Sequence, residues 1–88
     1  MHIMILGAAG MLGRKLAHQI ATNDVRVPQP ATRLTLVDSV EPEVPTDSGI
    51  PIQSMPLNLT DSGAASELAK LNPDIIFHLA AVVSGEAE

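Results

Sequence analysis

The chain has 88 residues, of which 45% are hydrophobic and 17% charged, and its ten acidic and five basic residues give a net charge of −5. This acidic balance, with one aromatic residue, excludes nucleic acid as an expected partner, and the lack of cysteine excludes a disulfide framework and a thiolate nucleophile. Because no apolar run approaches the roughly 20 residues of a membrane span, we expect a cytoplasmic protein with no membrane partner.

The first predicted elements are a strand and a helix. Residues 2–6 (HIMIL) are apolar and partly β-branched, which indicates a buried strand that ends at Gly7. From Met11 the apolar residues follow a helical period instead, so we expect a helix of about three turns. Its predicted apolar face carries Leu12, Leu16, Ala17, Ile20 and Ala21.

Two further strands are expected after long connections. Residues 22–32 are polar with two prolines and predict a loop, and residues 33–37 (RLTLV) predict a second strand that stops at Asp38. Residues 39–49 are acidic, contain proline and predict irregular structure. Residues 50–57 predict a third strand, and its prolines place it near an edge of the sheet.

The last predicted elements are a second helix and a fourth strand. Asp61 is the expected N-cap of a helix that runs to about Leu71, before Asn72 and Pro73 end it. The apolar face of this helix is expected to carry Ala64, Ala65, Leu68 and Leu71. Residues 74–83 (DIIFHLAAVV) are almost continuously apolar, which is typical of a strand covered on both faces.

Strands that alternate with helices in this way predict an α/β fold with right-handed parallel crossovers. We expect the amino-terminal half of a doubly wound (Rossmann) parallel sheet with strand order 3-2-1-4. Residues 1–88 would then form one incomplete dinucleotide-binding domain, with no second domain in the chain.

Gly7, Gly10 and Gly13 lie where the first strand meets the first helix. A helix N-terminus presents unpaired N–H groups and a positive dipole, so a pyrophosphate fits there, bound by the N–H groups of Met11 and Leu12. Gly7 would give the tight turn, Gly10 the close approach of the phosphates, and Gly13 the close packing of helix on sheet. The spacing differs from the G-x-G-x-x-G fingerprint, and the alternative is a structural turn without a ligand.

Asp38, at the end of the second strand, strengthens the dinucleotide interpretation. A carboxylate there accepts hydrogen bonds from the hydroxyls of an adenosine ribose and repels a 2′-phosphate, which favours NAD over NADP. Arg14 and Arg33 are the nearby cations that could instead receive a 2′-phosphate. The alternative for Asp38 is a turn residue at a solvated strand end.

Four segments together resemble one family. GAAGMLG at 7–13, VD at 37–38, NLTD at 58–61 and HLAAVVSG at 78–85 match, in order and spacing, the extended short-chain dehydrogenase/reductases, which include NAD-dependent epimerases and dehydratases. These segments extend over nearly the whole chain. The last of them is most similar to the branch that oxidises four-carbon sugar acids.

The resemblance implies roles for residues beyond the glycine loop and Asp38. Asn58 and Leu59 would flank the adenine; many family members have Asp at position 58, but an Asn amide both donates and accepts, so it can meet the adenine amino group. The residues expected beneath the cofactor are Leu79, Ala80 and Ala81. Val83 would face the nicotinamide, and Ser84 a small-molecule substrate, either a sugar acid or a nucleotide sugar. From the residues alone, the alternative for this last set is ordinary core packing.

The histidines and carboxylates do not predict a metal site, because the three His are scattered and the acidic residues lack ligand spacing. His78, within IIFHLAA, is expected to be a buried, hydrogen-bonded core residue rather than a catalytic one. His2 and His18 are expected to be structural or on the surface.

The residues that the family uses for its chemistry are missing. The family transfers a hydride between substrate and nicotinamide with a Tyr and a Lys in a Y-x-x-x-K motif, whereas this chain has no tyrosine and only two lysines, Lys15 and Lys70. We therefore expect no catalytic residue here and interpret the chain as the amino-terminal part of a longer enzyme. Alone it is predicted to bind NAD weakly and to lack dehydrogenase activity, and a homodimer is expected only of a full-length protein.

Three functions fit these residues. The first is the cofactor-binding part of an NAD-dependent sugar-acid dehydrogenase, and the second is the same part of a nucleotide-sugar epimerase or dehydratase. The third is a dinucleotide-sensing module without catalysis. A Y-x-x-x-K motif after Glu88 would favour an enzyme, and its absence a module.

Overall fold

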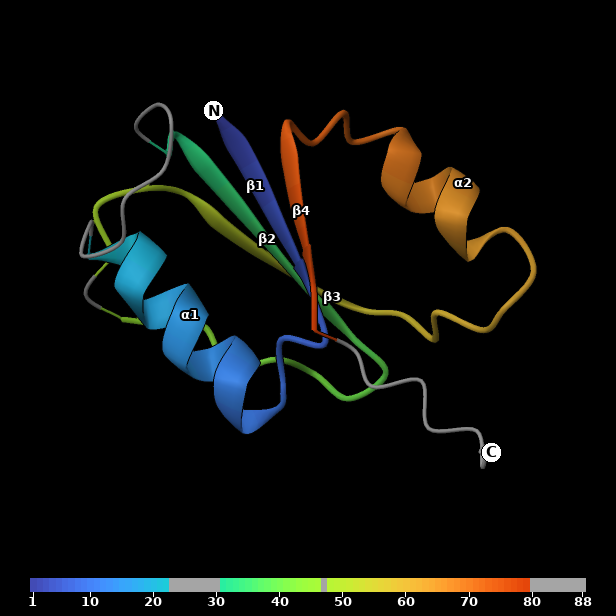
Figure 1. Ribbon diagram of the computed structural model, residues 1–88, viewed down its shortest axis with the longest axis horizontal. Coiled ribbons are helices and arrows are strands. Elements are labelled where there is room, and N and C mark those ends of the chain that lie inside the picture. Colours follow the sequence, from blue (N-terminus) through green and yellow to red (C-terminus); the bar gives the residue numbers. More distant parts are fainter. Residues whose placement is uncertain (23–30, 47, 80–88) are drawn as a thin grey trace.

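A computed structural model shows one parallel sheet with a helix on each face (Figure 1). It describes residues 1–22, 31–46 and 48–79. The strands are β1 (His2–Leu6), β2 (Arg33–Asp38), β3 (Ile52–Pro56) and β4 (Ile75–His78), in the order β3-β2-β1-β4. This confirms the α/β class and the predicted strand order.

β1 lies in the middle of the sheet and determines its register. Ile3 is opposite Leu34 of β2 on one side and Ile75 of β4 on the other, and both pairings are parallel. Because residues 2–5 have neighbours at both edges and a helix on each face, all four are buried. β3 pairs only with β2, as its prolines predict for a strand at the edge of the sheet.

Helix α1 (Met11–Ala21) covers one face of the sheet, and its orientation confirms the predicted apolar face except at Leu12. Leu12 is 68% exposed and Met11 84%, so neither belongs to the core. The buried residues of α1 are Gly13, Ala17, Ile20 and Ala21. Gly13 and Ala17 are small enough to let the helix lie close to the sheet. Leu16 also packs against the core, so Leu12 alone of the predicted face lies toward solvent.

Helix α2 (Ala64–Ala69) covers the opposite face and is shorter than the predicted helix. Its N-cap is Gly63, in the left-handed region with φ of 88°, and not Asp61. Asp61 contributes only its backbone carbonyl, which accepts a hydrogen bond from the Ala64 N–H (3.1 Å). The buried residues of α2 are Ala64 and Leu68, whereas Ala65 is exposed.

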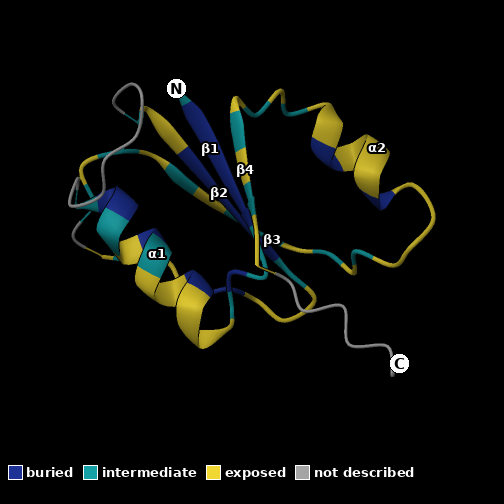
Figure 2. Ribbon diagram, in the orientation of Figure 1, coloured by how far each residue is buried: buried dark blue, intermediate teal, exposed yellow. Residues whose placement is uncertain are grey.

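β4 corrects the prediction of a strand covered on both faces. Its residues alternate between half-buried and exposed (Figure 2), with Ile75 and Phe77 packed against the core beneath α1. Ile76 is 51% exposed, and His78 is exposed rather than buried in the core. The cause is the position of α2, whose Leu68 packs on Met4 and Val37 of β1 and β2 and leaves the same face of β4 uncovered.

His2 is a buried structural residue that ties β1 to the turn before β4. Its Nδ1 lies 3.1 Å from the carbonyl of Leu71, which can only accept, so Nδ1 carries the proton. Nε2 shares a second hydrogen bond with the Thr35 hydroxyl, 2.7 Å away. The His2 backbone N–H also donates to the carboxylate of Asp74 (2.7 Å).

Candidate functional site

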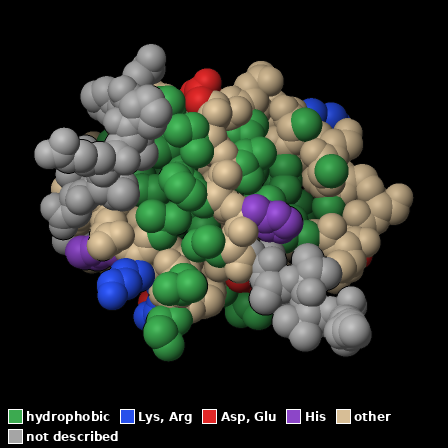
Figure 3. Space-filling model, in the orientation of Figure 1, with side chains coloured by type: hydrophobic (Ala, Val, Ile, Leu, Met, Phe, Trp, Pro, Cys, Tyr) green, Lys and Arg blue, Asp and Glu red, His purple; other side chains and the backbone are tan. Residues whose placement is uncertain are grey.

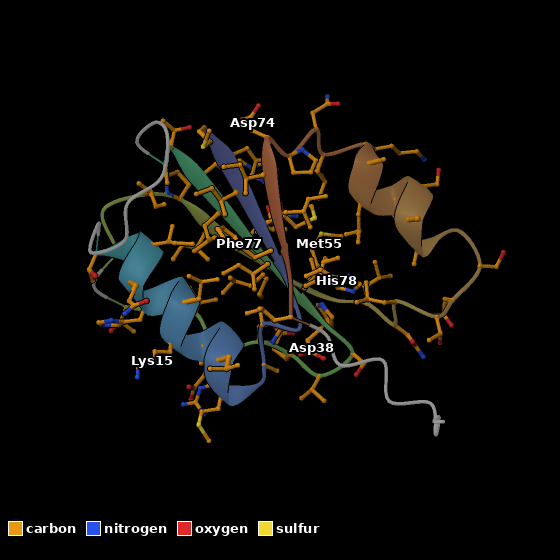
Figure 4. All side chains as sticks on the ribbon, viewed as in Figure 1. Lys15, Asp38, Met55, Asp74, Phe77 and His78 are labelled. Carbon is orange, nitrogen blue, oxygen red and sulfur yellow. The ribbon has the colours of Figure 1, made fainter. Side chains whose placement is uncertain are left out.

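The site residues with described positions gather at one edge of the sheet. Gly7 follows β1, Asp38 ends β2, Asn58 and Leu59 follow β3, and Leu79 follows β4. Because all four strands are parallel, these positions share the carboxyl edge, where open α/β sheets bind ligands. Figure 4 shows Asp38 and His78 at this edge and Asp74 at the opposite end of β4. Ala80, Ala81, Val83 and Ser84 lie outside the described residues.

The end of β2 fixes the first half of the glycine loop, residues 7–13. The Gly7 and Ala8 N–H groups both donate to the Val37 carbonyl, at 2.8 and 3.1 Å. The next N–H, that of Ala9, donates to the Asp38 carboxylate at 2.9 Å. The Gly10 N–H then turns back to the Gly7 carbonyl (3.3 Å). Every N–H from residue 7 to residue 10 is therefore used within the protein.

The second half of the loop has backbone N–H groups without a partner among the described residues. The first bond of α1 runs from the Arg14 N–H to the Gly10 carbonyl at 2.9 Å. In the part of the chain that the structure describes, the N–H groups of Met11, Leu12 and Gly13 meet no acceptor. They lie at the positive end of the helix dipole, an arrangement that binds phosphate groups.

The three glycines of the loop differ in whether backbone conformation or packing requires glycine. Gly7 has φ of 90°, which disfavours any residue with a side chain. A Cβ at Gly13 would lie 2.3 Å from the Gly7 carbonyl oxygen and 2.7 Å from the Ala8 Cα, so close packing requires glycine. At Gly10, φ is −75° and the nearest atom to a Cβ would be 3.6 Å away, so nothing within the protein requires glycine. The space in front of Gly10 is therefore open among the described residues.

The two arginines that could bind a 2′-phosphate, Arg14 and Arg33, differ in their position relative to Asp38. Arg33 begins β2 and donates to Gln53 (3.1 Å), about 16 Å along the strand from Asp38 at roughly 3.3 Å per residue. Arg33 is therefore at the wrong edge of the sheet. Arg14, in the first turn of α1, is 2.6 Å from Glu43 in the segment after β2, and that ion pair occupies its guanidinium.

Asn58 uses its side-chain oxygen within its own turn. Oδ1 accepts hydrogen bonds from the Thr60 N–H (3.0 Å) and the Thr60 hydroxyl (2.7 Å). The side-chain NH₂ remains, and because this group only donates, it suits a ring nitrogen of adenine rather than the amino group. Leu59 packs against the core beneath α2. The Leu79 N–H donates to the Leu6 carbonyl (2.8 Å), which keeps the chain against β1 at this edge.

The Ala9 N–H and its bond to Asp38 were not expected from the sequence. A backbone donor leaves no residue signal, and the only hint was an acidic residue placed after the second strand. Among the described residues, no group of three His, Asp or Glu is placed to hold a metal ion. None of the helices that the structure describes is long and apolar enough to cross a membrane.

Comparison with known proteins agrees with this geometry. The model of the NAD dependent epimerase/dehydratase family matches residues 3–88, and the chain belongs to this family. It is 35% identical over 92 residues to D-erythronate dehydrogenase from Cupriavidus necator and 36% identical over 89 residues to that from Haemophilus influenzae. Both matches cover 100% of this chain but only 28% and 27% of the relatives.

A solved structure shows the same fold. The crystal structure of the nucleoside-diphosphate-sugar epimerase from Agrobacterium tumefaciens has a TM-score of 0.87 and is 43% identical in sequence. The match covers 100% of this chain and 26% of that one. The chain thus spans about a quarter of the length of each of these three proteins.

Proposed function

We propose that the chain binds NAD(H) at the carboxyl edge of its sheet. The observation that carries this proposal is the set of unpaired N–H groups at Met11 and Leu12, in front of a glycine that nothing within the protein requires. These N–H groups would bind the pyrophosphate, and Asp38 would accept from the adenosine ribose. Asn58 and Leu59 would flank the adenine, with Leu79, Ala80, Ala81 and Val83 along the cofactor.

NAD is proposed over NADP on the basis of charge. The Asp38 carboxylate would repel a 2′-phosphate, and Arg14, which could otherwise receive one, is paired with Glu43. Isothermal titration calorimetry of the chain with each dinucleotide tests this. We expect NAD to bind and NADP to bind at least tenfold more weakly. Equal affinities would refute the preference, and no heat with either would refute the site.

For the whole protein we propose hydride transfer from a sugar acid to NAD, which accepts the hydride when bound. The two D-erythronate dehydrogenase matches support this proposal, and Ser84 would face the substrate. A nucleotide-sugar epimerase or dehydratase is the second candidate, supported by the Agrobacterium structure at 43% identity. If the reading frame continues past Glu88, the longer protein can be assayed for NADH formation with four-carbon sugar acids and for epimerisation of nucleotide sugars.

The 88 residues are proposed to bind the cofactor without turning it over. The chain has no tyrosine to act as the family's acid/base, so we expect no NADH formation with any hydroxy acid. Turnover by the purified chain would refute this. A longer reading frame without a Y-x-x-x-K motif would instead favour a dinucleotide-sensing module, which calorimetry would still detect.

A further inference from the structure

We propose that Asp38 is a positioning residue for the glycine loop and that it couples the pyrophosphate subsite to the ribose subsite. This inference rests on the proposed function and gives Asp38 a second task within it. Its basis is the 2.9 Å hydrogen bond from the Ala9 N–H to Asp38 Oδ2, which joins the loop to the next strand before any ligand binds.

This bond is the last of three consecutive contacts between the loop and β2. The first two, from the Gly7 and Ala8 N–H groups, end on the Val37 carbonyl and would form with any residue at position 37. The third requires a side-chain acceptor at position 38. Since Asp38 is half-buried, water replaces this acceptor only in part.

The bond between Ala9 and Asp38 holds the peptide unit that precedes α1 and so determines how the first N–H groups of α1 are oriented. Ala9 directly precedes Gly10, the N-cap of α1, and the peptide unit that carries the Ala9 N–H is planar. When Asp38 holds this peptide unit, the orientation of the following turn is limited. The N–H groups of Met11 and Leu12 are thereby held in place before pyrophosphate arrives, which lowers the ordering cost of binding.

The carboxylate has enough acceptor positions for both tasks. It offers about four lone pairs. The Ala9 N–H uses one on Oδ2, and the Ser39 N–H uses one on Oδ1 at 2.7 Å. The Ser39 hydroxyl is a weaker third contact at 3.4 Å and is free to rotate away. About two positions remain for the two ribose hydroxyls, so ribose binding leaves the Ala9 bond in place and strengthens the loop.

Binding of inorganic pyrophosphate tests this proposal. The two possible roles of Asp38 predict opposite changes in pyrophosphate affinity when Asp38 is substituted. Asp38→Ala removes the acceptor of the Ala9 bond together with a negative charge beside the anion. If Asp38 only holds ribose, this change leaves pyrophosphate binding unchanged or makes it tighter. If Asp38 positions the loop, the change makes pyrophosphate binding weaker. By NMR titration of the chain we expect D38A to bind pyrophosphate about tenfold more weakly than wild type, the effect of one lost charge-assisted bond. Equal or tighter binding would overturn the proposal.

Glu41→Gln is the matched control, because it removes the same charge from the segment after β2 without touching the loop. Its pyrophosphate affinity should stay within about twofold of wild type. A tenfold loss in E41Q as well would attribute the effect to charge and overturn the proposal.

Amide hydrogen exchange in the wild-type chain needs no variant. We expect the Ala9 N–H to exchange at least tenfold more slowly than those of Met11 and Leu12, which have no acceptor among the described residues. Equal rates would overturn the proposal even if D38A does not fold. A protected Ala9 without NAD binding would refute the proposed function alone, and NAD binding with an unprotected Ala9 would refute the positioning role alone.

Discussion

At the scale of single residues, Gly10 and Gly13 differ in how much space a side chain would have. A methyl group at Gly13 meets backbone atoms at 2.3 and 2.7 Å, which cannot move aside as a side chain can. A methyl group at Gly10 would contact only a carbonyl oxygen, at 3.6 Å. The backbone conformation of Gly10 is also one that alanine adopts readily. Packing within the protein therefore requires glycine at position 13 but not at position 10.

We expect Gly13→Ala to lower the free energy of unfolding by about 2–3 kcal/mol, as overpacking does. Gly10→Ala should change it by less than about 1 kcal/mol while weakening NAD binding at least tenfold, because its methyl group occupies the space left for the phosphates. Urea unfolding and calorimetry measure the two quantities, and each variant is the control for the other. If G10A bound NAD normally, the pyrophosphate would not lie in front of Gly10.

His2 and His78 form a second contrasting pair. His2→Leu leaves the Thr35 hydroxyl and the Leu71 carbonyl without their partner, and we expect a loss of about 1–3 kcal/mol in the free energy of unfolding. His78→Gln, at an exposed position, should stay within about 0.5 kcal/mol of wild type. Thermal and urea unfolding distinguish them. Similar losses in both variants would contradict the exposed position of His78.

At the scale of elements, the segment after β2 carries two glutamates with different partners. Glu43 pairs with Arg14 of α1, whereas Glu41 accepts from the Ser54 hydroxyl of β3. Both pairs are exposed and add little to stability, about 0–1 kcal/mol each. The Glu43 pair matters for a different reason, since it occupies the arginine that follows the glycine loop.

Glu43→Gln should therefore raise the affinity for NADP relative to NAD. With the ion pair lost, the Arg14 guanidinium can turn to a 2′-phosphate, and we expect the ratio of the two dissociation constants to change about three- to tenfold, or about 0.7–1.4 kcal/mol. Glu41→Gln removes the same charge without releasing Arg14 and should leave the ratio unchanged. Calorimetry with both dinucleotides measures it, and an equal change in both variants would refute a role for Arg14.

The elements themselves were predictable where local chemistry decides them. β1 and β2 are apolar runs that end at Gly7 and Asp38, and the sequence predicted their bounds to within one residue. The helical period also predicted most of the buried face of α1, because Leu16, Ala17, Ile20 and Ala21 are buried or pack against the core. The exposure of Leu12 was not predictable. Nor was the exposure of His78, which depends on where α2 lies over other strands. Within the candidate site the sequence predicted that Gly7, Asp38, Asn58 and Leu79 follow or end parallel strands, and they do share the carboxyl edge. The Ala9 bond to Asp38 was not predictable, because a backbone donor has no sequence signature.

At the scale of the whole molecule, β4 is an edge strand with one uncovered face. Figure 3 shows hydrophobic side chains across the front of the molecule, where β4 lies, and Ile76 is 51% exposed. Edge strands with exposed apolar side chains favour association between copies. In the arrangement of Figure 1, the edge of β4 is thus open to contact with another copy of the chain.

We expect the chain to self-associate as its concentration rises, and Ile76→Thr to reduce this association without a large loss of stability, because the side chain is only half covered. Ile75→Thr is the control: Ile75 packs against the core beneath α1, so this change should lower the free energy of unfolding instead. Light scattering and urea unfolding follow the two effects. Association that is unchanged in I76T would place the contact elsewhere.

The central position of β1 also affects the order in which the parts of the chain fold. Met1 bonds to Thr32, 31 residues later, and His2 to Asp74, 72 residues later, so the first strand to be synthesised finds no partner nearby in the sequence. Folds made of such distant pairings form slowly and leave early strands unpaired during synthesis. The glycine loop leaves the ribosome early but takes its binding shape only once residues 37 and 38 have joined the sheet.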